Sequence, residues 1–98
     1  MKSLNIIVVG LGQQSLEDHL PAIRKSKYYN LIGISDTDTP VMDRTAKEYG
    51  VRCANGVSDL LEKLEEKPDV ALIAVPHKEY PCRHRLQQRY HRVLQLFE

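Results

Sequence analysis

Residues 4–36 read LNIIVVGLGQQSLEDHLPAIRKSKYYNLIGISD, and this stretch decides the fold. An apolar run ends at the turn Gly10-Leu11-Gly12, and a second apolar run, residues 31–34, comes shortly before Asp36. Continuous apolar runs are typical of parallel strands that are covered on both faces. A helix between two such strands returns the second one parallel to the first. The stretch therefore predicts a β-α-β unit with a glycine turn after its first strand.

The glycine turn is suited to binding phosphate. Backbone N–H groups and the positive end of the following helix converge on such a turn, and an acid after the second strand can accept hydrogen bonds from ribose hydroxyls. Gly10 and Gly12 fill the first two positions of a G-x-G-x-x-G fingerprint, and Ser15 fills the third, where glycine serves helix packing. A glycine turn by itself is weak evidence for phosphate binding, because any strand-to-helix turn can use glycines for backbone reasons. With its flanking strands and Asp36, it predicts a dinucleotide site.

The rest of the chain continues the alternation of strands and helices. Expected helices are 13–25, interrupted near Pro21, and 40–49, capped by Asp38 or Thr39 and ended by Gly50. A third helix is expected with Ser58 as its N-cap and Pro68 at its end. Expected further strands are 51–54 and the apolar run 70–75. Short links between these elements predict a doubly wound parallel α/β sheet, Rossmann-like, in three layers α/β/α with strand order 3-2-1-4. The cofactor should cross the carboxyl edge of this sheet.

Composition excludes several classes of partner. The chain has 98 residues, enough for one domain, and a formal net charge of +1, so it has no global field that would recruit nucleic acid or an anionic membrane. No apolar run approaches the ~20 residues of a membrane span, and the N-terminus does not resemble a signal peptide. We expect a cytoplasmic protein with neither nucleic acid nor membrane as a partner.

Neither the cysteines nor the histidines form a metal-binding pattern. Cys53 and Cys82 are the only cysteines and lie far apart in sequence, so we expect two reduced thiols. His84 and His91 could share a helix face, but seven helical residues would separate them by ~10 Å, too far for one ion. His77 and Lys78 are interpreted as a solvated pair. The sequence predicts no metal site and assigns no catalytic residue.

A set of short segments carries a more specific pattern. These segments are Val9-Gly10-Leu11-Gly12, His19-Leu20-Pro21-Ala22-Ile23, Gly33-Ile34-Ser35-Asp36, Ala46 with Tyr49-Gly50-Val51, and residues 68–76, PDVALIAVP. Together they resemble the N-terminal NAD(P)-binding domain of the Gfo/Idh/MocA oxidoreductases, which include glucose-fructose oxidoreductase and inositol 2-dehydrogenase. The resemblance covers Leu4 to about Tyr80 and implies hydride transfer between a nicotinamide cofactor and a sugar, cyclitol or related compound. It implies residues 1–80 as the NAD(P)-binding domain.

The resemblance also implies a set of cofactor-binding residues. The phosphate turn would comprise Gly10, Leu11, Gly12, Gln13 and Gln14. Asp36 and Thr37 would lie at the ribose, and Ala74, Val75, Pro76 and His77 would line the nicotinamide half. Because position 36 is an acid and no arginine follows to receive a 2′-phosphate, NAD is expected over NADP.

The pattern changes after Tyr80, where the family usually has a histidine. Leu96-Phe97-Glu98 stands where the resemblance places a Glu-Lys-Pro motif with an active-site lysine, and the second, substrate-binding domain is missing. Residues 81–98 are interpreted as a divergent basic segment that forms an amphipathic helix packed on the same domain, or as the product of truncation or a frame change. The open edge of strand 70–75 would accept either a fifth strand from this segment, a second copy or a complementing chain.

Three functional hypotheses follow. The chain is the cofactor half of an oxidoreductase, with little or no turnover by itself; or it is a non-catalytic dinucleotide-binding or regulatory module; or it is a folded remnant whose crevice binds nothing.

Overall fold

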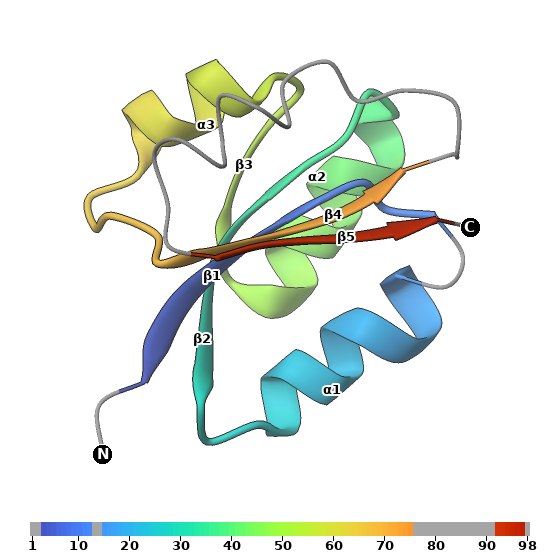
Figure 1. Cartoon of the computed structure of the whole chain (residues 1–98). Helices are drawn as coiled ribbons and strands as arrows, with labels where there is room; N and C mark the ends of the chain where they lie inside the picture. The colour runs from blue at the N-terminus through green and yellow to red at the C-terminus, as the bar shows by residue number, and fades with distance from the viewer. Residues whose placement is uncertain (1–2, 13–14, 76–91, 98) are drawn as a thin grey trace.

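A single parallel sheet forms the centre of the molecule. The computed structural model describes residues 3–12, 15–75 and 92–97. The strands are β1 Leu4–Val9, β2 Tyr29–Ser35, β3 Arg52–Ala54, β4 Val70–Val75 and β5 Arg92–Phe97. They lie in the order β3-β2-β1-β4-β5, and each neighbouring pair is parallel (Figure 1). The predicted order 3-2-1-4 is confirmed, and β5 extends it.

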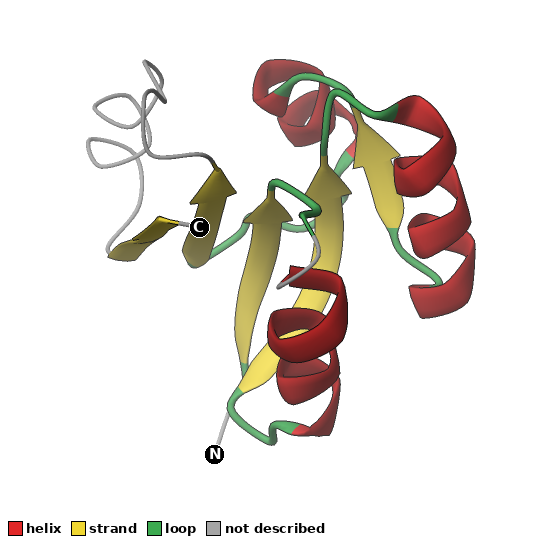
Figure 2. Ribbon diagram, turned by 90° about the vertical axis from the view of Figure 1, so that its right-hand side faces the viewer, coloured by secondary structure: helices red, strands yellow, loops and turns green. Residues whose placement is uncertain are grey.

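Helices cover both faces of the sheet. They are η1 Ser15–His19, a π-helix that continues into α1 Leu20–Lys25, then α2 Thr39–Tyr49 and α3 Val57–Lys63. Residues of α1 and α2 join one core cluster and Leu60 of α3 joins the other, so the predicted three layers are present. The arrowheads of the central strands mark the carboxyl edge of the sheet (Figure 2).

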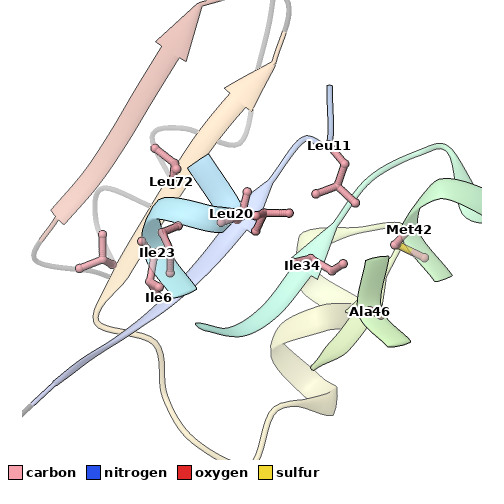
Figure 3. Packing of buried hydrophobic residues seen from close by; sticks show 10 residues of the cluster. Ile6, Leu11, Leu20, Ile23, Ile34, Met42, Ala46 and Leu72 are labelled. Atoms are coloured by element: carbon pink, nitrogen blue, oxygen red, sulfur yellow. The ribbon is translucent and has the colours of Figure 1, made fainter. Parts of the chain in front are cut away.

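Alternate residues of β1 supply the two core clusters. Ile6 and Val8 pack on the α1–α2 side, whereas Ile7 and Val9 pack on the α3 side. Figure 3 shows the first cluster, in which Leu20 and Ile23 of α1 lie over the sheet. Burial on both faces is the reason that β1 reads as one uninterrupted apolar run.

Helix boundaries near Pro21 and Gly50 agree with the sequence prediction. The helix changes from π to α between His19 and Leu20, just before Pro21, whose ring cannot donate a backbone hydrogen bond. Gly50 ends α2 with φ 66° and its N–H donates to the Ala46 carbonyl. Asp38, one of the two candidate caps of α2, accepts a bond from the Val41 N–H at 3.3 Å.

The predicted bounds of the third helix are wrong at both ends. Gly56, not Ser58, is the N-cap of α3, and no side chain caps it. The helix ends at Lys63 because Leu64 turns extended, with ψ 134°, well before Pro68. A Cβ built on Gly33 would lie 3.1 Å from Leu64 Cδ2, so this turn packs Leu64 against β2. Tertiary packing, not the proline, therefore sets the end of α3.

The predicted C-terminal helix is wrong for Arg92–Phe97, which is the strand β5. This strand pairs with the whole of β4, from Val70 opposite Arg92 to Val75 opposite Phe97. An unpaired strand edge presents a row of backbone donors and acceptors, and β5 satisfies those of β4. The alternative of a fifth strand from the tail is thus confirmed, and the edge of β4 is closed to a second chain. Residues 81–91 lie outside the described part.

The left-handed cap at Gly50 allows a matched test of stability. Nothing lies within 4 Å of a Cβ built there, so a side chain would meet backbone strain and no clash. Gly50→Ala is expected to lower the free energy of unfolding by about 1 kcal/mol. Gly50→Asn should cost less than half of that, because asparagine tolerates the left-handed region. Urea denaturation of the three proteins measures both values, and equal losses would contradict the strained cap.

Candidate functional site

The glycine turn lies at the carboxyl edge, directly after β1. Gly10 has φ 102°, a conformation that side-chain-bearing residues rarely adopt, and its N–H donates to the Ser35 carbonyl at 2.8 Å. This bond joins the start of the turn to the end of β2. The predicted role of Gly10 in making a tight turn fits this geometry.

Asp36 joins the glycine turn to the loop that follows β2. Its Oδ2 accepts a hydrogen bond from the Leu11 N–H at 2.9 Å. Its Oδ1 accepts bonds from the Thr37 N–H at 2.6 Å and the Asp38 N–H at 3.3 Å. The carboxylate is partly buried, and three backbone donors from two loops set its orientation. It is therefore fixed beside the turn in advance of any ligand.

A further side chain, Asn55, belongs to this edge, and the sequence prediction missed it. Its Nδ2 donates to the Asp36 carbonyl at 2.9 Å and to Thr39 Oγ1 at 3.0 Å, and its own carbonyl accepts from Ser35 Oγ at 3.2 Å. Asn55-Gly56 is typical of a turn, so the sequence is interpreted as a turn and no hydrogen bonds are predicted for the Asn55 side-chain amide. The signal that could have found it is its place directly after β3, where parallel strands bring their following residues to one edge.

Two buried polar atoms of η1 have no hydrogen-bond partner among the described residues. Leu16 N–H donates to the Gly12 carbonyl at 3.1 Å, which starts the helix immediately behind the turn. Ser15, in the third fingerprint position, is fully buried. Its Oγ and the His19 Nε2 have no hydrogen-bond partner within the part of the chain that is described. Ser15 thus occupies a packing position, as the fingerprint predicts.

The end of β4 lies beside the same turn. Val9, the last residue of β1, is opposite Ile73, so Ala74 and Val75 extend past the end of β1. The structure therefore brings Ala74 and Val75 to the edge that carries Gly10, Leu11, Gly12, Asp36 and Thr37. Gln13, Gln14, Pro76 and His77, the other predicted cofactor residues, lie outside the described part.

These residues fit a dinucleotide. The turn supplies a glycine in a backbone conformation closed to side chains, and a helix begins behind it. Asp36 Oδ2 accepts a single bond among the described residues, which leaves a lone pair for a ribose hydroxyl. By contrast, the described residues include no group of three or more His, Cys, Asp or Glu that could hold a metal ion. They also include no helix long and apolar enough to span a membrane.

The doubly wound sheet, the glycine turn and the acid after β2 define a dinucleotide-binding domain of the Rossmann class. The family model described as oxidoreductase family, NAD-binding Rossmann fold, matches residues 4–96. The chain therefore belongs to the Gfo/Idh/MocA oxidoreductases, and it is their NAD-binding domain. A comparison with curated proteins finds no match.

Solved structures share the fold at low sequence identity. The WlbA dehydrogenase from Bordetella pertussis, in complex with NADH and UDP-GlcNAcA, is 23% identical with a TM-score of 0.78 over 96% of this chain and 28% of its own. Myo-inositol 2-dehydrogenase from Lactobacillus plantarum is 21% identical with a TM-score of 0.65, and the match covers 76% of this chain and 22% of that dehydrogenase. A 3-ketoreductase from Actinomadura kijaniata, in complex with TDP-benzene and NADP, is 18% identical. Its TM-score is 0.78, and the match covers 96% of this chain and 30% of the ketoreductase. The chain spans less than a third of each of these proteins.

One cysteine lies near the site, on β3. Cys53 is a free thiol, and its Sγ donates to Asp43 Oδ1 at 3.7 Å. Burial, together with the neighbouring Asp43 carboxylate, raises the pKa of this thiol, and Lys63 opposes the shift. A raised pKa keeps the thiol protonated at neutral pH, so its reactivity should appear only at higher pH.

Alkylation measures this effect. In a Cys82→Ser background, iodoacetamide at pH 8 should modify Cys53 more slowly than a cysteine in an unfolded peptide. Asp43→Asn should speed the reaction a few-fold, because removing the carboxylate lowers the pKa of the thiol. A rate that is unchanged or slower in Asp43→Asn would contradict the assigned cause.

Proposed function

We propose that this domain holds NAD across the carboxyl edge of its sheet and serves a dehydrogenase that acts on a sugar, a cyclitol or a related hydroxylated compound. The observation that carries the proposal is the Asp36 carboxylate, fixed at 2.9 Å from the Leu11 N–H of the glycine turn. This contact joins the carboxylate to the glycine turn, and it supports the pairing of a ribose acceptor with a phosphate turn that a dinucleotide requires.

Each part of the cofactor would meet a different set of residues. The turn from Gly10 to Gln14 would bind the pyrophosphate, aided by the positive end of the helix behind it. Its donors would be the N–H groups after Leu11, because those of Gly10 and Leu11 already bond Ser35 and Asp36. Asp36 would accept hydrogen bonds from the adenosine ribose, and Thr37 would lie beside it. The segment from Ala74 to His77 would line the nicotinamide half. The end of β4 beside the turn supports this assignment for Ala74 and Val75.

The fixed carboxylate favours NAD over NADP. A 2′-phosphate would bring negative charge against Asp36, and the three backbone donors on that carboxylate oppose a rotation away from the phosphate. No basic side chain contacts Asp36 among the described residues, so nothing there would compensate the repulsion.

The nicotinamide, when bound, supplies the hydride chemistry, and the residues of this chain bind and orient it. UDP-GlcNAcA in the complex of the WlbA dehydrogenase and the name of myo-inositol 2-dehydrogenase support a hydroxylated substrate. No described residue of this chain is assigned to proton transfer or to substrate binding. We place the protein in the cytoplasm, where Cys53 would remain a free thiol.

Calorimetric titration with NADH tests the cofactor site. Gly12→Val should weaken binding strongly, because a branched side chain would block the approach of the pyrophosphate to the turn. Asp36→Ala should weaken binding about ten- to hundredfold, since it removes hydrogen bonds to a charged acceptor. NADPH should bind the unchanged protein more weakly than NADH does.

A matched control uses Glu62→Ala, a change on the exposed face of α3 that should leave NADH affinity unchanged. Circular dichroism establishes that each variant is folded. Folded protein that does not bind NADH, or an Asp36→Ala variant with unchanged affinity, would refute the proposed site. NADPH binding tighter than NADH binding would refute the proposed selectivity.

A further inference from the structure

Asn55 stands next to Asp36 because of the sheet register. β2 and β3 are parallel, with Ser35 opposite Ala54. Asp36 and Asn55 are the residues that follow this pair, so both lie at the carboxyl edge of the sheet, next to each other. Asn55 is exposed, and its contacts are polar. Its side chain is therefore available for a role outside the hydrophobic core.

Both donors of the Asn55 amide are used to hold the loop after β2. One bond reaches the Asp36 carbonyl at 2.9 Å, where the loop begins, and the other reaches Thr39 Oγ1 at 3.0 Å, where α2 begins. The Asn55 carbonyl accepts from the buried Ser35 hydroxyl at 3.2 Å, which fixes the backbone of Asn55 in turn. The amide thus bridges the two ends of a loop that has no regular secondary structure.

The same short loop carries the carboxylate that faces the glycine turn. Asp36 has its backbone carbonyl bound by Asn55 and its Oδ2 bound to the Leu11 N–H. Fixing the backbone of Asp36 limits the positions that its carboxylate can reach, because the side chain has only two rotatable bonds. Release of the carbonyl would let the loop move and carry the carboxylate away from the turn.

We propose that Asn55 is a positioning residue for Asp36, which it holds in the orientation that the ribose requires. This inference rests on the proposed function, because it assumes that Asp36 contacts the cofactor. Asn55 itself acts through the loop and need not touch the dinucleotide. The expected consequence is that most of its effect on cofactor affinity exists only while Asp36 is present.

A double-mutant cycle in NADH titration tests this dependence. Asn55→Ala should weaken NADH binding about three- to tenfold, the loss expected for one or two hydrogen bonds. In the Asp36→Ala background the same change should have a much smaller effect, since the carboxylate that Asn55 positions is gone. Asn55→Leu, which is close in size and lacks both donors without adding charge, should reproduce the loss of affinity. Asn30→Ala is the matched control, because Asn30 bonds Asn5 at the amino end of the sheet.

The outcomes separate the two proposals. If Asn55→Ala leaves NADH affinity unchanged, or weakens it equally with and without Asp36, the positioning role is wrong. If Asp36→Ala alone leaves affinity unchanged, the proposed function fails first. The ratio of NADPH to NADH affinity adds a readout that a merely structural role would not move. It should rise toward one in Asn55→Ala while the melting temperature stays within the range of the Asn30→Ala control.

Discussion

The hydrogen bond from the Leu11 N–H to Asp36 Oδ2 joins the two parts on which the site depends. A glycine turn alone has many accessible conformations, and fixing each residue costs about 1–2 kcal/mol of conformational entropy. Here Gly10 is bound to the Ser35 carbonyl and Leu11 to the Asp36 carboxylate. The end of β2 thus holds the start of the loop after β1, and the Asp36 carboxylate is bound to it by a backbone hydrogen bond.

The sheet makes this contact available. Val9 of β1 lies opposite Ser35 of β2, so the turn and Asp36 emerge next to each other. Ala54 of β3 lies opposite Ser35 in the same way, and it brings Asn55 to the edge. β1 itself is buried on both faces, with Ile6 and Val8 on one side and Ile7 and Val9 on the other.

Sequence reasoning found the parts of the molecule that local chemistry dictates. The apolar strands, the strand order, the left-handed cap at Gly50 and the membership of the oxidoreductase family were predictable, and so was the place of Asp36 after β2. The contacts made across the sheet were not. Asn55 reads as a turn residue, and the end of α3 depends on how Leu64 packs near Gly33. Arg92–Phe97 has a pattern that also suits a helix, and its pairing with β4 is a long-range contact that the local sequence does not show.

Amide hydrogen exchange at Leu11, followed by NMR, tests the central contact most directly. Leu11 lies after the end of β1, so its amide has no partner in the sheet and its protection reports the bond to Asp36. The Leu11 amide should be protected in the unchanged protein and should lose that protection in Asp36→Ala, while the Val8 amide inside β1 stays protected in both. A Leu11 amide that exchanges at the rate of an unstructured peptide, or that stays equally protected without Asp36, would contradict the account.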